Sequence, residues 1–412
     1  MNMSVNLRDE LLRRADELPL DEFDLTNWYL MEQDAVWPYF ERLRREDPVH
    51  YHADSRYGPY WSVTRFDDIK AVDQNHGVFS SAGSIGMEDQ AEDFTLPMFI
   101  AMDQPVHDVQ RKVVSPVVGP KNLAGFEATI RERVGRVLDE LPVGETFDWV
   151  DRVSIELTTQ MLATLFNFPF EERRKLTFWS DCTTDTTMTQ EERRDALLDC
   201  LAYFTALWHQ RKDEAPAFDL VSMLAHGDAT RDMINRPFEY LGNILLLIVG
   251  GNDTTRNSMT GGVLALNQFP GEYDKLRADH GLIPNMVAEI IRWQTPLAYM
   301  RRTALQDTEL GGRQIKQGDK VVMWYASGNR DEAKFENADQ LIIDRPNARN
   351  HISFGFGIHR CMGNRLAEMQ LRILWEEIMQ RFARVEVVGE PKRVRSNFVR
   401  GYSELPVRLH RV

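Results

Sequence analysis

A glycine-dense segment near the C-terminus, FGFGIHRCMG, holds the residues best suited to chemistry, Cys361 and His359. Its glycines allow tight turns and a close approach of the backbone to a flat cofactor. A helix is predicted from about Asn364 onward, and the amides at its start stabilise a cysteine thiolate. Cys361 could therefore bind iron, with His359 as the competing ligand. The ordinary alternative is a free cysteine that fills space in the core.

A second candidate lies in a long apolar segment, where GGNDTT interrupts a run of Leu, Ile and Val residues. Gly250 and Gly251 are followed closely by Asp253 and Thr254. Glycine inside a helix costs up to about 1 kcal/mol relative to alanine, and a buried acid and hydroxyl cost more unless they are hydrogen-bonded. A helix that only fills the core would avoid both, so this interruption predicts a functional groove.

The elements that must position these residues are mostly helices, which makes the expected fold class mainly α with a small β region. Apolar residues at three- and four-residue spacing predict helices over residues 37–45, 123–141, 153–166, 191–211, 237–267 and 364–382. Short strands are predicted over residues 60–63, 320–324 and 385–388. Gly311-Gly312 predicts a hairpin turn between residues 308–310 and 313–315. No linker or repeat divides the chain, so we expect a single domain over residues 1–412, with residues 1–36 as an N-terminal arm.

The composition excludes several classes of function. A formal net charge of -14 and a pI of about 5.3 make nucleic acid an unexpected partner. The three cysteines show no disulfide or CxxC pattern, which favours a reducing, cytoplasmic location. The N-terminal residues carry charges throughout, so neither a signal peptide nor an anchor is expected. The longest uncharged apolar stretch, residues 240–252, is shorter than the roughly 20 residues of a membrane-spanning helix.

Residues 354–363, with the pattern Phe-x-x-Gly-x-His-x-Cys-x-Gly, resemble the haem-binding loop of the cytochrome P450 family, and the resemblance extends over nearly the whole chain. It implies the fold of that family, a triangular helical prism with haem b buried between the oxygen-groove helix and the cysteine loop. It also implies that Cys361 is the iron ligand and that His359 is only a neighbour of the haem. The other loop positions that the resemblance places beside the haem are Phe354, Gly355 and Gly363.

The resemblance assigns roles to the other motifs as well. In the groove, small Gly250 and Gly251 leave room for O₂. Thr254 then supplies the hydroxyl for oxygen activation, and Asp253 relays protons from solvent. A local distortion of the helix is part of this implied arrangement.

Charged residues outside the groove also match the family. Glu289 and Arg292 lie three apart and can pair on a helix. With Arg345 they resemble the buried network that braces the haem loop, which is a structural role. Haem propionates need cationic or neutral donors. The positions that match the family's propionate contacts are His107, Arg111, Arg302 and His351.

Several short sequence segments are most similar to the bacterial terminal alkane and fatty-acid ω-hydroxylases. They are residues 99–112, 250–258, 296–304, 321–332 and 351–372. This implies terminal hydroxylation of a medium-chain alkane or fatty acid, with a terpenoid or alkyl-aromatic methyl group as the alternative substrate. Residues themselves indicate only that the pocket is apolar. Besides residues 94–102, the predicted pocket walls are Leu246, Leu247, Leu297, Ala298, Phe398 and Val399.

The chain carries no GxGxxG fingerprint, no P-loop and no cysteine set for an iron–sulfur cluster, so the electrons for catalysis must come from other proteins. The resemblance implies a 2Fe-2S ferredoxin served by an NAD(P)H-dependent reductase. A basic patch on the acidic protein is the predicted docking site, formed by Arg349, Arg360, Arg365 and Arg372. Two alternatives are a peroxide-driven haem enzyme and a haem-binding sensor; the Asp253–Thr254 pair argues against both.

Overall fold

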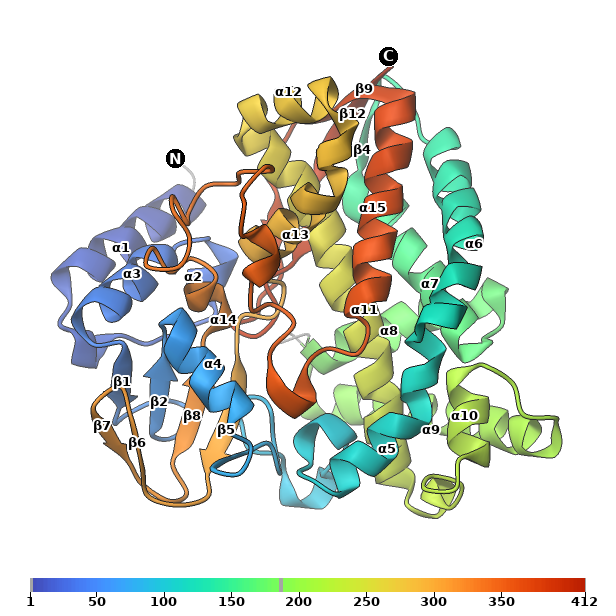
Figure 1. Ribbon diagram of the computed structural model, residues 1–412, viewed down its shortest axis with the longest axis horizontal. Coiled ribbons are helices and arrows are strands. Elements are labelled where there is room, and N and C mark those ends of the chain that lie inside the picture. Colours follow the sequence, from blue (N-terminus) through green and yellow to red (C-terminus); the bar gives the residue numbers. More distant parts are fainter. Residues whose placement is uncertain (1–2, 185–187, 412) are drawn as a thin grey trace.

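The computed structural model describes residues 3–184 and 188–411, and helices make up most of it (Figure 1). The mainly α fold class with a small β region is confirmed. The helices are α1 (Met3–Glu17), α2 (Tyr29–Glu32), α3 (Trp37–Glu46), α4 (Phe66–Gln74), α5 (Val106–Val114), α6 (Pro120–Asp139), α7 (Glu156–Phe166), α8 (Arg174–Thr184), α9 (Gln190–Asp213), α10 (Leu220–His226), α11 (Pro237–Gln268), α12 (Pro270–Ala278), α13 (Ile283–Gln294), α14 (Tyr325–Gly328) and α15 (Asn364–Arg381).

The six helices predicted from periodicity correspond to α3, α6, α7, α9, α11 and α15, and the differences lie at their ends. α6 begins at Pro120, three residues before the predicted start, because proline is suited to the first helical position. Val150–Ile155 forms a π-helical turn directly before α7, where the prediction had begun a single α-helix at residue 153. α9 begins with a capping box in which Thr189 and Glu192 satisfy each other's backbone amides.

The small β region consists of one larger sheet and three smaller pairings. A five-stranded sheet has the order β1 (Val49–His52), β2 (Tyr60–Val63), β8 (Lys320–Met323), β5 (Met300–Ala304) and β3 (Phe79–Ser80). β12 (Pro406–Arg411) pairs with β4 (Thr146–Asp148) and β9 (Phe382–Val387), and β10 (Lys392–Arg393) pairs with β11 (Tyr402–Glu404).

The predicted hairpin is confirmed. β6 (Thr308–Leu310) and β7 (Arg313–Ile315) pair antiparallel with Leu310 opposite Arg313. Gly311 and Gly312 have φ values of 55° and 77°, the left-handed backbone that a two-residue hairpin turn requires.

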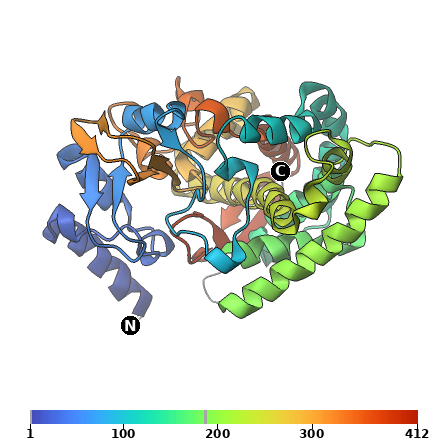
Figure 2. The same ribbon diagram turned by 90° about the horizontal axis from the view of Figure 1, so that it is seen from below.

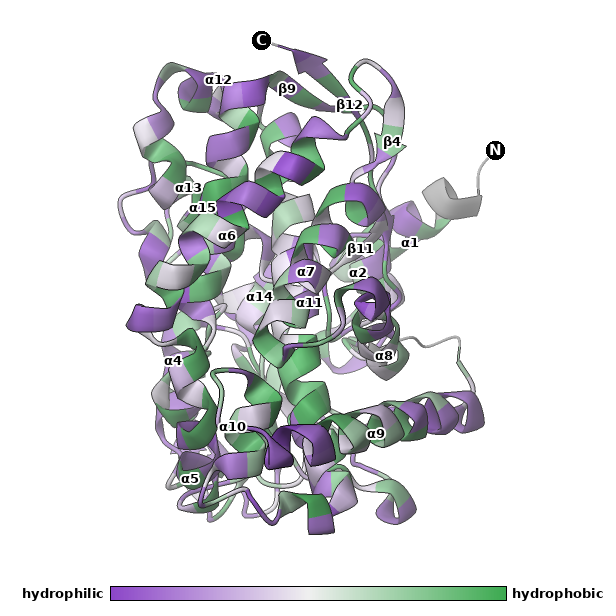
Figure 3. Cartoon of the chain, turned by 90° about the vertical axis from the view of Figure 1, so that its right-hand side faces the viewer, coloured by the Kyte–Doolittle hydropathy of each residue, from purple (hydrophilic) through white to green (hydrophobic). Residues whose placement is uncertain are grey.

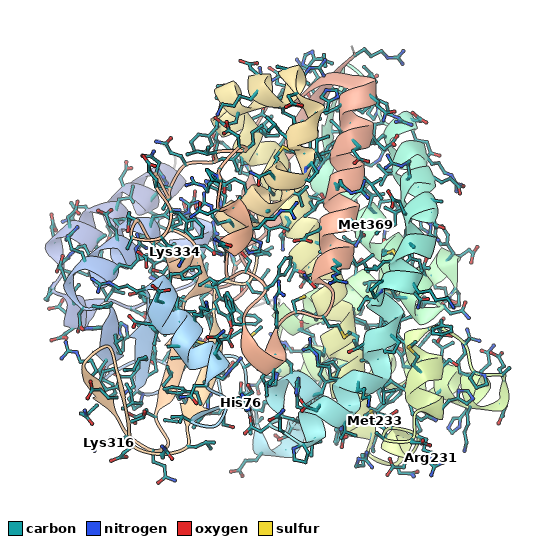
Figure 4. The ribbon with its side chains drawn as sticks, in the orientation of Figure 1. His76, Arg231, Met233, Lys316, Lys334 and Met369 are labelled. Atoms are coloured by element: carbon teal, nitrogen blue, oxygen red, sulfur yellow. The ribbon has the colours of Figure 1, made fainter. Side chains whose placement is uncertain are left out.

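The main hydrophobic core lies among the helices, and α11 runs through its middle (Figures 1 and 2). Hydropathy colouring shows mainly hydrophobic residues along the lower half of α11, whereas the outer end of α9 is hydrophilic (Figure 3). Met233 is fully buried before α11, and Met369 of α15 packs against the same core from the other side (Figure 4). α11 is therefore the element around which the helical half is assembled.

A second hydrophobic cluster joins the N-terminal segment to the five-stranded sheet. Within residues 1–36, the segment predicted to be an arm, Leu11, Phe23 and Leu25 are buried in this cluster together with Trp324. Trp37 lies at the edge of this cluster, and the centre of its ring is 3.6 Å from the guanidinium carbon of Arg330. The segment is thus packed against the body from α1 onward. Among the described residues, no helix is both long and apolar enough to cross a bilayer.

Candidate functional site

A cavity of about 880 Å³ brings together most of the residues singled out in the sequence. Its walls come from α11, the loop before α15, residues 84–101, α7 and the start of α9. Cys361 lines this cavity, whereas Cys182 and Cys200 are buried on α8 and α9. Among the described residues, no group of three or more His, Cys, Asp or Glu side chains could hold a metal ion. A metal at Cys361 therefore needs a cofactor that brings its own ligands.

The loop before α15 presents the Cys361 thiol to the cavity. The Cys361 amide donates a hydrogen bond to the Phe354 carbonyl at 2.8 Å, which closes the loop. Burial raises the pKa of the Cys361 thiol, whereas hydrogen bonds from the amides of Gly363 and Asn364 lower it. Gly357 has a φ of 66°, and a Cβ there would lie 2.6 Å from the Asp73 carbonyl oxygen. The glycines thus let the loop pack directly onto α4.

Cationic and neutral donors gather beside the same loop. Arg111, Arg302 and His359 line the cavity, and the His107 ring lies 4.1 Å from the His359 ring. Within the described part of the chain, both ring nitrogens of His359 and Nε2 of His107 are buried without a hydrogen-bond partner. Burial lowers the pKa of His359 to about 3, so its ring is neutral. A neutral imidazole has one N–H, so the His359 ring could donate one hydrogen bond to a carboxylate.

Two of the predicted propionate contacts, His107 and His351, do not line the cavity wall itself and stay predictions. The Nδ1 atom of His107 is 2.7 Å from an Asp108 carboxylate oxygen, which leaves only Nε2 free to face inward. The His351 ring packs 5.1 Å from the Phe354 ring, and its Nδ1 accepts the Ser353 amide at 3.2 Å. His351 therefore shapes the loop from behind.

A buried carboxylate that sequence reasoning missed also holds the loop. Asp73, at the end of α4, accepts hydrogen bonds from Arg302 at 2.7 Å, the Tyr325 hydroxyl at 2.9 Å and the Phe356 amide at 2.7 Å. These contacts join α4, β5, α14 and the cysteine loop. The Arg302 guanidinium therefore already has an anionic partner, Asp73, within the protein itself. The sequence around Asp73 is that of an ordinary amphipathic helix and carries no signal for this role.

The two glycines of the α11 groove have different surroundings and therefore different roles. A Cβ on Gly250 would meet nothing within 4 Å, so this position is open. A Cβ on Gly251 would lie 2.8 Å from Cδ2 of Leu162, so Gly251 permits the close approach of α7. The Thr254 hydroxyl lines the cavity and donates to the Gly250 carbonyl at 3.0 Å. α11 is a continuous helix here, and the local distortion implied by the family resemblance is absent from its described residues.

Asp253 is fully buried and points away from the cavity. Its Oδ1 accepts hydrogen bonds from Ser180 at 3.1 Å and Asn252 at 3.0 Å, and lies 3.0 Å from Nη2 of Arg256. The same guanidinium nitrogen pairs with Asp181, whose side chain is half exposed. Burial raises the pKa of Asp253, although the Arg256 charge opposes that shift. A buried acid is thereby connected through Arg256 to a carboxylate at the surface.

The structure brings Glu289, Arg292 and Arg345 together in one buried network. Arg292 donates to both Glu289 oxygens at 2.7 Å, and Arg345 Nε donates to the same carboxylate at 3.0 Å. Arg292 also donates to the carbonyls of Asn329 and Ala338 at 2.7 Å. The network joins α13 to the segment that leads into the cysteine loop.

Four of the six predicted substrate contacts, Leu246, Leu247, Leu297 and Phe398, line the cavity. The other two need correction, because neighbouring side chains in an extended segment point to opposite sides. Ala298 packs into the second hydrophobic cluster, and Val399 is buried with its amide bonded to Ser396. Sequence reasoning missed the α7 contribution, which consists of Met161, Leu162 and Leu165.

These features together fit haem. One thiol would supply a single protein ligand, and the glycine loop and the open Gly250 position leave space for a flat group. The buried His359 ring and Arg111, which line the same cavity, would hold its carboxylates. The rest of the wall is largely Leu, Ile, Met, Val and Phe, which suits both a macrocycle and an apolar substrate.

Comparisons with known proteins relate this chain to a family. A family described as Cytochrome P450 matches residues 239–401. Linalool 8-monooxygenase from Pseudomonas putida is 35% identical over 402 residues, which cover 94% of this chain and 98% of that protein. A methyl-branched lipid omega-hydroxylase from Mycobacterium bovis is 31% identical, with 95% of each chain covered. The solved structure of Cytochrome P450-153 from Novosphingobium aromaticivorans has a TM-score of 0.89 and 50% identity, and covers 94% of this chain and 99% of its own.

Proposed function

Because this chain belongs to the cytochrome P450 family, we propose that it is a monooxygenase that inserts one oxygen atom of O₂ into the terminal C–H bond of a medium-chain alkane or fatty acid. The family's cofactor is haem b, which activates O₂ with two external electrons when it is bound. One observation carries the proposal: a single cavity is lined by Cys361, by the groove at Gly250 and Thr254, and by apolar side chains.

The residues around the cofactor bind and orient it. Cys361 supplies the thiolate, and the amides that follow it stabilise the negative charge. Arg111 and the neutral ring of His359 offer donors to the two carboxylates. Asp73 keeps Arg302 and the cysteine loop in place.

The groove residues handle protons. The Thr254 hydroxyl lines the cavity and can turn from the Gly250 carbonyl toward a bound ligand. Burial raises the pKa of Asp253, which favours the protonated form more than in an exposed carboxyl group. Since its carboxylate points away from the cavity, a proton from Asp253 must pass through Thr254 or water. The Arg256 and Asp181 side chains connect Asp253 to the surface.

A second candidate substrate class is a terpenoid, favoured by the 35% identity to linalool 8-monooxygenase. A methyl group on such a substrate offers the same kind of primary C–H bond as the end of an alkane, and so does the methyl group of an alkyl-aromatic compound. The apolar walls at Leu246, Leu297 and Phe398 suit any of these substrates.

The test is a titration of the purified ferric protein with alkanes, fatty acids and monoterpenes, monitored by the Soret band. We expect a low-to-high-spin shift with linear chains, and primary alcohols as the products of turnover with NADH, reductase and ferredoxin. Products hydroxylated away from the chain end would contradict terminal hydroxylation. Turnover with peroxide alone, or none with any reductant, would favour a peroxide-driven enzyme or a haem sensor.

Electron delivery by a 2Fe-2S ferredoxin, with its NAD(P)H-dependent reductase, is the next part of the proposal. Arg349, Arg360 and Arg365 are exposed and surround Glu368 at the start of α15. Arg372 belongs less to this patch, because it pairs with Glu127 and Glu376 at 2.8 Å. The patch is therefore three arginines on an acidic protein, which suits an acidic partner. A cytoplasmic location is included in the proposal, and it is supported by the three cysteines, none of which forms a disulfide among the described residues.

Charge reversal tests this docking site. Arg365→Glu should lower the rate of ferredoxin-dependent reduction severalfold at low salt, and high salt should narrow the difference from wild type. Lys316→Glu is the matched control, because Lys316 lies at the β6–β7 end of the molecule, away from α15 (Figure 4). Equal effects of the two variants would rule out this patch as the docking site.

A further inference from the structure

The turn at Glu92–Phe94 and the start of α9 are joined by the Arg194–Asp93 pair, and both of these residues line the cavity and are exposed to solvent. We call this exposed part of the wall the mouth of the cavity. Among the described residues, five charged side chains both line the cavity and are exposed. They are Glu88, Asp89, Asp93, Glu191 and Arg194. These exposed residues are four carboxylates and one guanidinium, although Asp89 is paired with two cations and Arg193 also lines the cavity. The net charge of -14 on the whole protein disfavours an incoming anion at long range.

The guanidinium at the mouth is already engaged. Nη1 of Arg194 lies 3.0 Å from an Asp93 carboxylate oxygen, so α9 is tied to the turn that faces it. The same guanidinium stacks 5.0 Å from the centre of the Phe94 ring. Phe94 packs in turn edge-on against Phe238 at 5.3 Å. Asp93 therefore neutralises the exposed cation that a substrate carboxylate would meet first.

Other positive groups near the mouth are also occupied. Arg301 and Lys320 pair with Asp89 at 2.6 Å and 2.7 Å. At the N-terminus of α9, the capping box satisfies the amides of Thr189 and Glu192 and places the Glu192 carboxylate there. Glu191 adds a further negative charge in the same turn, which opposes an incoming carboxylate. Arg301 and Lys320 offer it no unpaired charge.

We propose that the Arg194–Asp93 pair acts as a charge filter that makes the enzyme select neutral chains, such as alkanes and primary alcohols, over fatty-acid anions. The inference rests on the proposed function and decides between its two substrate classes. Arg194 keeps α9 and the turn together through the pair, while Asp93 prevents the guanidinium from serving as a carboxylate receptor. Removing only the Asp93 charge should convert the filter into a receptor.

The experiment compares dodecane, dodecanol and dodecanoate, which share one chain length and differ in charge. Soret titrations of the wild-type holoprotein should give tighter binding of dodecane and dodecanol than of dodecanoate. Asp93→Asn should tighten dodecanoate binding by about fivefold, the affinity equivalent of an exposed ion pair, and leave dodecanol unchanged. The double variant Asp93→Asn/Arg194→Gln should lose that gain. Added salt should reduce the gain as well.

Three results would overturn the inference. Equal wild-type affinities for dodecanol and dodecanoate would show that no filter operates. A change of the same size for both ligands in Asp93→Asn would show that the pair only holds the mouth closed. If none of the three ligands shifts the Soret band in any variant, the proposed substrate class is wrong, and the proposed charge filter is wrong as well. The first two results leave terminal hydroxylation intact.

Discussion

At the scale of single residues, the site depends on one thiol and one hydroxyl that line the same cavity. Cys361 lies in a loop tied to α4 by Asp73, and Thr254 lies on α11 beside the open Gly250 position. Neither side chain is unusual in itself. Their importance comes from the elements that bring them to one space.

Cys361→Ala should abolish the thiolate signature of the ferrous carbon monoxide complex, because no other cysteine among the described residues lines the cavity. The measurement is the absorption spectrum after reduction and addition of carbon monoxide. Cys200→Ser, in the buried interior of α9, is the control and should retain the wild-type spectrum. A thiolate spectrum from Cys361→Ala would exclude Cys361 as the ligand.

Thr254→Ala should retain haem but divert electrons to peroxide, since the hydroxyl beside the open groove is lost. We expect product formation per NADH to fall, because positioned proton transfer contributes about a hundredfold or more to the rate of a step. Thr255→Ala, one residue along the same helix, is the control. Full coupling in Thr254→Ala would exclude the proton role of this hydroxyl.

At the scale of elements, the packing of α11 against α7 explains the glycine pair. Gly251→Ala should destabilise the protein by roughly 1–3 kcal/mol, because the new methyl group would overlap Leu162. Gly250→Ala has free space and should stabilise the helix by up to about 1 kcal/mol while it narrows the groove. Chemical denaturation of both holoproteins measures the difference. The same stability for both variants would contradict the assigned packing.

The bracing network on α13 is the second element-scale feature. Glu289→Gln should destabilise the protein by about 3–5 kcal/mol, because Arg292 and Arg345 would remain buried without their shared anion. The measurement is the midpoint of urea unfolding, followed by haem absorbance and by circular dichroism. Glu309→Gln in the exposed hairpin is the control. A loss below about 1 kcal/mol would mean that water reaches the network.

At the scale of the whole molecule, buried neutral histidines link stability to pH. Burial lowers the pKa of His52 to about 3 and that of His351 to about 3, from an ordinary value of 6.5. The unfolded chain therefore binds more protons below pH 6.5 than the folded chain. The stabilisation is present above that pH and is lost progressively as the pH falls toward 3.

We expect the free energy of unfolding to decrease measurably between pH 7.5 and about pH 5 for this reason. Replacing His52 with Gln should make that decrease smaller, whereas His280→Gln, at an exposed position, should leave it unchanged. Denaturant titrations at several pH values provide the measurement. An unchanged pH dependence in His52→Gln would show that other groups control acid unfolding.

The sequence by itself determined the fold class, the family and those candidate site residues that lie in local motifs. Helical periodicity, the Gly311-Gly312 turn and the cysteine loop are local signals, and each depends on neighbours within a few positions. Cys361, Thr254 and the Glu289–Arg292 pair could be found for the same reason.

Only the tertiary structure decided which side chains reach the cavity. Asp73 and the α7 residues come from distant parts of the chain, and local spacing carries no signal for them. Ala298 and Val399 were wrongly placed in the pocket, because the side of the backbone that faces a cavity is set by packing against other elements. The pairing of Arg194 with Asp93 likewise exists only because α9 folds over a turn about one hundred residues away. Contacts of this kind depend on the tertiary packing of the whole chain, whereas motifs depend only on residues that are close in the sequence.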